Sequence, residues 1–454
     1  MSINSNKKVV TRFAPSPTGS FHVGGVRSAL YNFLFARQNN GTYILRSEDT
    51  DKERSKKEYE EEFLELFIWL GLKYDLFFRQ SDRLEIYQKY LKKMINDGYA
   101  YLSKEIPKEE GQREEVIRFK NPNKKISFDD LILGEIIVDT TDLGDFVIAR
   151  DMNEPLYHLT VVVDDFEMGI THVIRGQEHT PNTPRQILIQ EAIGAPRPIY
   201  AHLPLILNNK RAKLSKRDKS VMPAIEYKRN GYLPEAILNF MALNGWNPGG
   251  EQELFTLEEL VKIFDITKVQ KGGGVFNPEK LDWINKEYMK KLPTDELEKH
   301  VFKWLPKELQ IKKIVPIIVE RISKFGDIKE MVEKGELDFF YKKPEYIKEK
   351  LIYPPTGDLS EGDKKAKIEK IINNLKEVLN TIEMTEEIDF NKENIKIILM
   401  EIADKLENRG EILHPVRFAL SGLDKSPDPF ILADILGKKE VISRINKAIS
   451  ILSL

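Results

Sequence analysis

The 454-residue sequence contains no cysteine. Disulfides, thiolate nucleophiles and zinc sites that require a thiolate are therefore excluded. The chain also lacks an excess of charge of either sign, because 70 Lys and Arg residues face 72 Asp and Glu residues, a formal net charge of -2. A nucleic-acid partner would therefore have to bind local basic patches, since the overall electrostatic field does not attract one.

Long hydrophobic runs are absent as well. No apolar segment is long enough to cross a bilayer, and the polar first eight residues are not followed by the apolar region of a signal peptide. We therefore expect a cytoplasmic protein without a membrane partner. The composition, 41% hydrophobic and 31% charged, is typical of a folded protein, and the length predicts two to four domains.

The first hundred residues alternate between strand and helix patterns. The predicted elements are a strand at 8–14, a helix at 23–38, a strand at 43–46, and helices at 55–70 and 82–98. Ser55 and Glu58 have the spacing of a capping box, and Gly71 suits the C-terminal end of that helix. This alternation predicts a parallel α/β sheet.

The pattern changes twice further along the chain. Residues 103–130 are polar and rich in Lys and Glu, so we expect an insertion there, with strands at 136–138 and 146–148. Strand patterns of the main sheet return at 159–163 and 199–207, and a helix pattern begins at 234–243. Beyond about 290, apolar residues recur at helical spacing, which predicts a separate, all-helical domain.

The segment 12–25 combines a strand end, a turn rich in Pro and Gly, and a helix start. Small residues allow a nucleotide to approach the backbone, and a helix N-terminus attracts anions. His22 could donate a hydrogen bond to a phosphate oxygen. The alternative is an ordinary tight turn in which Gly and Pro have only a steric role.

Three further segments could carry chemistry. Residues 211–217 place several cations around Ser215, which suits transferring phosphates, although a solvated surface run is the alternative. Residues 46–51 follow a strand, where open α/β sheets bind ligands, or they simply start the next helix. Arg175, in the segment 174–179, could bind a carboxylate, or it could form a structural ion pair with Asp164 or Asp165.

Together, and in this order, these segments resemble a known family. His22-Val23-Gly24-Gly25 after a strand and turn, and the later Lys213-Leu214-Ser215-Lys216-Arg217, are similar to the two signature segments of class I aminoacyl-tRNA synthetases. Longer strings resemble the bacterial-type glutamyl-tRNA synthetases. These strings are 11–19, 46–51, 79–83, 157–158, 163–165, 231–236, 280–283 and 415–422. The resemblance extends over nearly the whole chain.

The resemblance implies ATP-dependent ligation of L-glutamate to tRNA(Glu) through glutamyl-adenylate, with release of pyrophosphate and AMP. It implies that His22, Lys213 and Lys216 are catalytic. The implied ATP site consists of Pro15, Ser16, Thr18, Gly19, His22, Gly24, Gly25, Lys213, Ser215 and Lys216. Mg²⁺ would accompany ATP, and we expect no metal held by the protein, zinc included.

The implied glutamate site consists of Arg12, Ser16, Glu48, Tyr157 and Arg175. A buried guanidinium that pairs with the side-chain carboxylate would discriminate against glutamine, because glutamine leaves that charge unpaired. Glu48 would suit the substrate ammonium. Arg417 and Ser426, flanked by turn-forming Pro residues, are the candidates for tRNA contact in a loop. Whether tRNA(Gln) is also charged stays open.

The implied fold is a multidomain α/β protein. It has a Rossmann-like parallel-sheet catalytic domain, a small α+β insertion and an all-helical C-terminal anticodon-binding domain, and we expect a monomer. The implied divisions are the two catalytic halves at 1–100 and 151–210, an acceptor-stem insertion at 101–150, a stem-contact region at 211–290 and the anticodon-binding domain at 291–454.

Two features depart from the wider family. Gly25 stands where the class signature often has a second His, although the glutamate branch commonly has Gly there. The insertion is short and has no cysteine. The rival interpretations are a glutaminyl-tRNA synthetase, a short paralogue that modifies a tRNA base, a non-catalytic tRNA-binding relative and a generic nucleotidyltransferase. The helical pattern after 290 disfavours the first, and the chain length disfavours the second. The presence of His22, Lys213 and Lys216 disfavours the third. A generic nucleotidyltransferase would not explain the set of Arg12, Arg175 and Tyr157 or the C-terminal domain.

Overall fold

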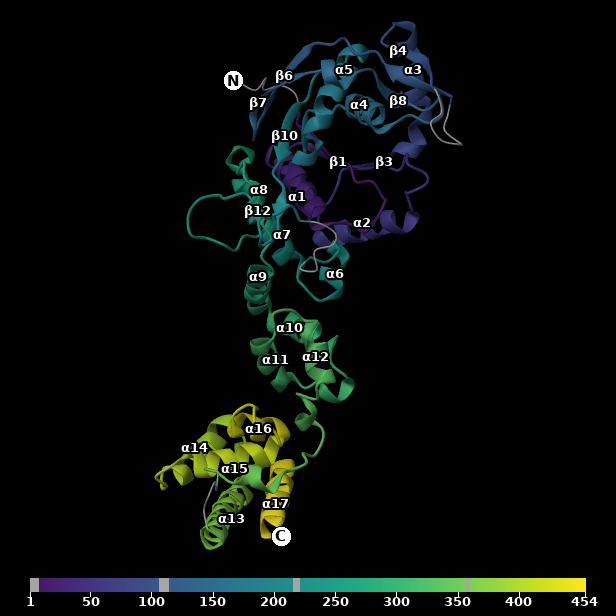
Figure 1. Ribbon diagram of the computed structural model, residues 1–454. Helices are drawn as coiled ribbons and strands as arrows, with labels where there is room; N and C mark the ends of the chain where they lie inside the picture. The colour runs from purple at the N-terminus through teal and green to yellow at the C-terminus, as the bar shows by residue number, and fades with distance from the viewer. Residues whose placement is uncertain (1–7, 106–113, 215–220, 356–359) are drawn as a thin grey trace. The chain divides into compact units, whose positions relative to one another are not determined.

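The structure, a computed structural model, describes residues 8–105, 114–214, 221–355 and 360–454 (Figure 1). The chain forms two compact units, Met1–Tyr288 and Met289–Leu454. The first unit is α/β and the second consists of helices, which confirms the predicted fold class. The finer division of the first unit into four segments stays a prediction.

A seven-stranded sheet organises the first unit. Its order is β3 (Leu76–Arg79), β2 (Thr42–Ser47), β1 (Val10–Phe13), β9 (His172–Gly176), β10 (Ile199–Leu203), β6 (Lys125–Asp130) and β7 (Gly134–Asp139). Every neighbouring pair is parallel except β6 and β7. The strand order changes direction between β1 and β9, and such a switch point opens a ligand crevice at the carboxyl ends of the strands.

Helices connect and cover these strands. The first are α1 (Val23–Gln38), α2 (Lys57–Leu70), α3 (Leu84–Asn96), α4 (Tyr157–Glu167) and α5 (Thr183–Ile193). The unit continues with β11 (Ile206–Leu207), α6 (Ala224–Arg229), α7 (Pro234–Leu243), α8 (Leu257–Ile263) and β12 (Gly274–Val275), and α9 (Pro278–Lys291) begins in it. The helix predicted at 23–38 is confirmed with the same bounds, and the helical region predicted to start at 234–243 begins there with α7.

Two local predictions are wrong. Residues 159–163, predicted as a strand, lie in α4; every one of them is buried, so no helical alternation was visible and the β-branched run imitated a strand. The capping box of Ser55 and Glu58 does not form, because α2 begins at Lys57 and its N-terminal end has no side-chain cap. Gly71, in contrast, ends α2 in the left-handed conformation as predicted, with φ 69°.

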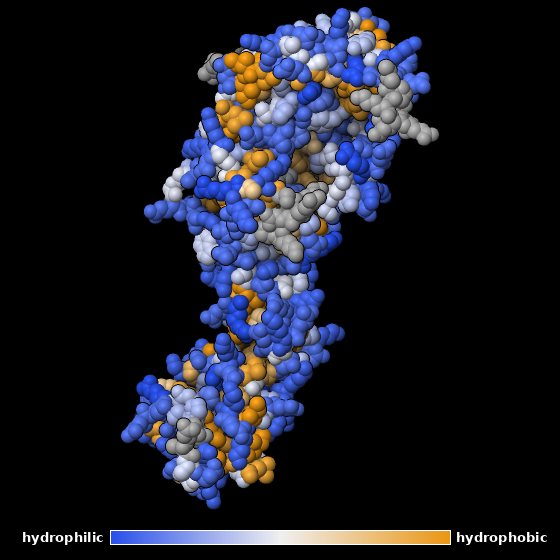
Figure 2. All heavy atoms as spheres, viewed as in Figure 1, coloured by the Kyte–Doolittle hydropathy of each residue, from blue (hydrophilic) through white to orange (hydrophobic). Residues whose placement is uncertain are grey.

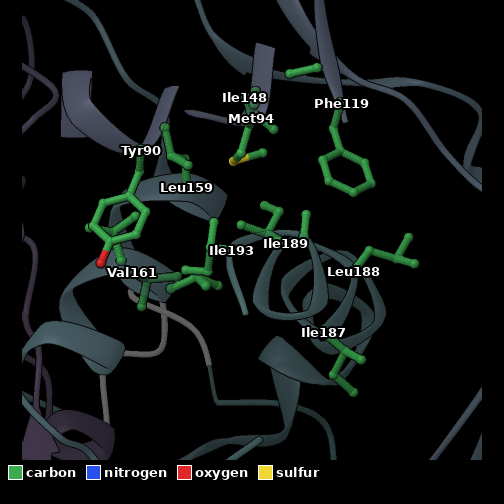
Figure 3. Packing of buried hydrophobic residues seen from close by; sticks show 14 of the residues in the cluster. Tyr90, Met94, Phe119, Ile148, Leu159, Val161, Ile187, Leu188, Ile189 and Ile193 are labelled. Carbon is green, nitrogen blue, oxygen red and sulfur yellow. The ribbon is translucent and has the colours of Figure 1, made fainter. Parts of the chain in front are cut away.

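The inserted segment shares its core with the main sheet. Its strands β4 (Ala100–Lys104), β5 (Glu115–Phe119) and β8 (Phe146–Ala149) form a separate three-stranded sheet, whereas β6 extends the main sheet next to β10 (Figure 1). Figure 3 shows Phe119 and Ile148 packed near Met94 of α3 and Leu159 of α4. Burial of these apolar side chains stabilises the insertion against the body that carries the crevice.

The second unit contains α10 to α17. Their bounds are α10 (Thr294–Phe302), α11 (Val315–Arg321), α12 (Asp327–Glu333), α13 (Glu361–Met384), α14 (Lys392–Ala403), α15 (Gly410–Ser421), α16 (Pro429–Leu436) and α17 (Lys438–Ser453). On the face shown in Figure 2, hydrophilic residues cover most of the surface and hydrophobic residues form small groups. None of the described helices is both long and apolar enough to cross a membrane.

Candidate functional site

A cavity of about 320 Å³ lies where β1 and β9 end. It brings together most of the residues that the sequence predicted for substrate binding. These are Arg12, Pro15, Ser16, Thr18, Gly19, His22, Gly24, Gly25, Glu48, Tyr157 and Arg175. The switch point of the sheet therefore collects segments that are up to 163 residues apart in the chain.

The turn after β1 prepares one wall of this cavity to bind an anion. His22 is the N-cap of α1, and its Nδ1 accepts a hydrogen bond from the Gly24 backbone N–H at 3.1 Å. An accepting Nδ1 carries no proton, so the neutral ring carries its proton on Nε2. The N-terminus of α1, whose helix dipole favours an anion, thus lies beside an imidazole donor.

Gly25 keeps this wall narrow. A Cβ atom built on Gly25 would lie 2.7 Å from the Phe21 ring, which is closer than real Cβ atoms come to a carbon. A Cβ on Gly24 would meet only His22 Nδ1, at 3.4 Å. The Phe21 ring therefore occupies the space that a side chain at position 25 would need, which explains why glycine stands there instead of the second His of the wider class signature.

A buried chain of charges supports the opposite wall. Arg12 of β1 binds Asp165 of α4 with Nε–Oδ1 at 3.0 Å and Nη2–Oδ2 at 3.3 Å. Arg46, at the end of β2, donates to Asp165 Oδ1 at 2.8 Å and to Glu48 Oε1 at 3.0 Å. Arg46 is fully buried and the other three are nearly so. The carboxylate that faces the cavity at Glu48 is thus held in place by Arg46.

Arg175 has a different environment. Its Nη1 donates to Gln186 Oε1 at 2.8 Å, its Nη2 donates to Thr183 Oγ1 at 2.8 Å, and its Nε lies 3.2 Å from His202 Nε2. Within the described part of the chain, no carboxylate pairs with Arg175, so the expected alternative of an ion pair with Asp164 or Asp165 is wrong. Burial lowers the pKa of this guanidinium, because its charge is desolvated without a counter-ion.

Burial also shifts the pKa of the neighbouring groups. It raises the pKa of Glu48 above its usual value despite the adjacent Arg46 guanidinium, and it raises the pKa of Tyr157. Burial together with Arg175 lowers the pKa of His179 to about 4, so this ring is neutral at neutral pH. His179 Nδ1 lies 3.2 Å from the Tyr157 hydroxyl, which the imidazole therefore orients.

The sequence did not single out several residues of the cavity. The lining also includes Ser28, Val161, Glu178 and His179. Arg46 does not line the cavity but donates a hydrogen bond to Glu48, which does. A signal existed for His179, which follows Arg175 in the segment 174–179. Nothing in the sequence indicated that Val161 lines a cavity, because it lies in an apolar segment that was predicted to be a buried strand.

The remaining predicted residues lie elsewhere. Lys213 is exposed and is not one of the residues that line the cavity. Its backbone pairs with that of Leu207 in an isolated antiparallel bridge. Ser215 and Lys216 lie outside the described residues. Arg417, predicted in a loop, lies in α15, because Pro415 is accommodated inside that helix. The Arg417 Nη1 donates to the Asp424 carbonyl at 2.9 Å, and Ser426 is partly buried.

No cluster of three or more His, Cys, Asp or Glu side chains suited to a metal occurs among the described residues.

Comparisons with known proteins agree with the geometry. The family model for tRNA synthetases class I (E and Q), catalytic domain, matches residues 8–115 and 105–283, and the model for an anticodon binding domain matches residues 294–449. These matches place the fold and its cavity in the class I tRNA synthetases.

Individual relatives narrow this assignment. The glutamate–tRNA ligase of Aquifex aeolicus is 39% identical, over 98% of this chain and 100% of that protein, and the one of Thermodesulfovibrio yellowstonii is 37% identical, over 97% and 99%. The crystal structure of a glutamate tRNA ligase from Elizabethkingia meningosepticum, in complex with its amino acid, superposes with a TM-score of 0.84 at 32% identity, over 98% of this chain and 99% of that one. The chain belongs to the glutamate–tRNA ligase family.

Proposed function

We propose that this chain activates L-glutamate with ATP and transfers the glutamyl group to tRNA(Glu). The observation that carries the proposal is one cavity in which the turn at 14–25 faces a buried Arg175 that has no acidic partner among the described residues. The turn suits the phosphates of a nucleotide, and the unpaired guanidinium suits a substrate with an additional carboxylate.

The chemistry needs no nucleophile from the protein. In the first step a glutamate α-carboxylate oxygen attacks the ATP α-phosphorus, and the bond between the α-phosphorus and the bridging oxygen breaks with release of pyrophosphate. In the second step a hydroxyl of the terminal tRNA ribose attacks the glutamyl carbonyl carbon, loses its proton and displaces AMP. Both steps depend on positioning and on charge stabilisation, which pre-oriented donors supply.

The phosphate side of the reaction would use the turn after β1. His22 would donate from Nε2 to a phosphate oxygen, while Gly24 and Gly25 leave room for the nucleotide against the backbone. Lys213 and Lys216 would approach from their own segment and stabilise the charge that develops on the phosphates. Mg²⁺ would arrive with the ATP phosphates.

The glutamate side would use the charged wall. Arg12 and Arg46 are paired with carboxylates, of Asp165 for both and of Glu48 and Asp164 for Arg46, whereas Arg175 has no carboxylate partner among the described residues. Glutamate, with two carboxylates and one ammonium, supplies the missing negative charge. Its ammonium would pair with Glu48 and its side-chain carboxylate with Arg175, where glutamine would leave the guanidinium unpaired.

The helical unit would read the anticodon, and Arg417 and Ser426 stay our proposed contacts there. A monomeric state and a cytoplasmic location likewise stay predictions, and charging of tRNA(Gln) stays an open alternative.

The test is an aminoacylation assay with labelled glutamate and, in parallel, labelled glutamine, in the presence of total tRNA, ATP and Mg²⁺. Glutamate incorporation alone supports the proposal, and sequencing of the charged tRNAs then distinguishes tRNA(Glu) from tRNA(Gln). No incorporation of either amino acid by the folded protein would overturn it.

A further inference from the structure

Three neutral side chains hold the guanidinium of Arg175, and none of them lines the cavity. They are His202 of β10 and the residues Thr183 and Gln186 of α5, and each accepts from a different guanidinium nitrogen. A guanidinium has five N–H groups, so among the contacts of the described residues two remain for a ligand, one on each Nη. Two parallel N–H groups are what a carboxylate accepts in a bidentate pair.

The contact from His202 depends on its tautomer. To accept from Arg175, the Nε2 atom must be unprotonated, so the ring must carry its proton on Nδ1. The Nδ1 atom lies 2.6 Å from Asp130 Oδ2, which can only accept when the carboxylate is ionised. Asp130 therefore selects the tautomer of His202 that Arg175 requires.

Asp130 is itself held rigidly. Its Oδ1 accepts from the backbone N–H groups of Ile132 and Leu133, both at 2.9 Å, and its Oδ2 also accepts from the His202 backbone N–H at 3.0 Å. The His202 ring is fully buried and Asp130 is 4% exposed. Burial alone raises the pKa of Asp130, but the hydrogen bonds from His202 and the two N–H groups bring it below the usual value, while burial lowers the pKa of His202.

These contacts form a relay from the inserted segment to the substrate cavity. Asp130 ends β6, whose register with β10 places it opposite Tyr200, two residues before His202. We propose that Asp130 and His202 are positioning residues that hold Arg175 for a carboxylate ligand and thereby set the preference for glutamate over glutamine. The proposal rests on the function proposed above, in which Arg175 binds the substrate side chain.

Two substitutions of His202 separate its acceptor from its donor. In His202→Gln the side-chain oxygen reaches the position of Nε2 and can still accept from Arg175. In His202→Asn the side chain ends at the position of Nδ1, so a donor to Asp130 remains and the acceptor for Arg175 is lost. His172→Asn is the matched control, because His172 is also buried in a strand of the sheet and does not line the cavity.

The measurement is kcat and KM for glutamate and for glutamine in the tRNA-charging assay, with thermal unfolding of each variant recorded. Loss of a buried hydrogen bond to a charged group should raise the KM for glutamate about tenfold to a hundredfold in His202→Asn, with a smaller change in kcat. The preference for glutamate should fall by a similar factor. His202→Gln should recover most of it, and His172→Asn should leave it unchanged.

An unchanged preference in a folded His202→Asn variant would overturn the proposal, as would equal losses in the Gln and Asn variants. If His202→Asn does not fold, Asp130→Asn tests the same relay, because an amide no longer selects one tautomer, and the preference should then fall in part. An unchanged preference in that variant would also overturn the proposal. Failure of the unsubstituted chain to charge glutamate would instead contradict the proposed function.

Discussion

Arg12 and Asp165, 153 residues apart in the chain, form a buried ion pair in which two guanidinium nitrogens face the two carboxylate oxygens. The pair joins the first strand of the sheet to α4. It also means that the charge of Arg12 is already neutralised, whereas Arg175, in the same cavity, is hydrogen-bonded to neutral side chains among the described residues. The two arginines predicted for glutamate binding are therefore not equivalent.

We predict that Arg175→Ala removes the preference for glutamate over glutamine. The substitution removes the one guanidinium of the cavity that has no acidic partner among the described residues, so the carboxamide no longer leaves a charge unpaired. The ratio of kcat/KM for the two amino acids in the charging assay measures the effect. Arg37→Ala, at an exposed ion pair with Asp75, is the control. An unchanged ratio would mean that selectivity lies elsewhere.

Asp165→Asn should destabilise the protein. It leaves Arg12 and Arg46 without their shared carboxylate in a buried position, and breaking such a pair costs about 3–5 kcal/mol. Glu191→Gln, at exposed pairs with Lys124 and Arg197, should cost less than about 1 kcal/mol. Urea unfolding of both variants gives the two free energies, and similar values for the two would contradict this account.

Lys213→Ala and Lys216→Ala should lower turnover far more than they weaken glutamate binding. Their charge is required when negative charge develops on the transferring phosphates, not when glutamate binds. Single-turnover kinetics together with a glutamate binding titration distinguish the two effects. A weaker affinity with unchanged turnover would rule out this role.

Gly25→Ala should impair the enzyme, although alanine usually stabilises a helix by about 1 kcal/mol relative to glycine. The added Cβ would collide with the Phe21 ring, which lines the cavity, so the turn must shift. Gly24→Ala, with a Cβ contact of only 3.4 Å to His22 Nδ1, is the matched control. The KM for ATP should rise in the first variant by a larger factor than in the second, and the reverse order would contradict the steric explanation.

The stability should fall as the pH is lowered from about 6.5 to about 4. Burial lowers the pKa of His172 to about 4, so between these values the unfolded chain, with an ordinary histidine pKa of about 6.5, binds a proton that the folded protein does not. The contribution is present in full above pH 6.5 and is lost as the pH falls, with a slope of at most about 1.4 kcal/mol per pH unit.

His172→Gln isolates this contribution. The difference in unfolding free energy between the variant and the unsubstituted chain, measured with urea at pH 7 and pH 5, should shrink at the lower pH. Titrating carboxylates are common to both proteins and cancel in the comparison. A difference that does not vary with pH would show that His172 is protonated in both states or in neither.

Some of this molecule could be predicted because its signals are local. The left-handed end of α2 at Gly71 follows from the conformational freedom of glycine, and the helices at 23–38 and 234–243 follow from apolar spacing. Contacts between distant segments gave no such signal. Residues 159–163 were interpreted as a strand because burial on every side of α4 hides the helical period.

By itself the sequence determined the fold class, the family and the residue types that the chemistry needs, because these depend on motifs and spacing within short segments. Only the tertiary structure decided which charges neutralise one another. Arg12 pairs with Asp165, and Arg46 pairs with both Asp165 and Glu48. Arg175 instead donates hydrogen bonds to the neutral side chains of His202, Thr183 and Gln186. The physical reason is that an ion pair requires atoms within a few ångströms of each other, and that proximity is set by how strands and helices pack, not by their order along the chain.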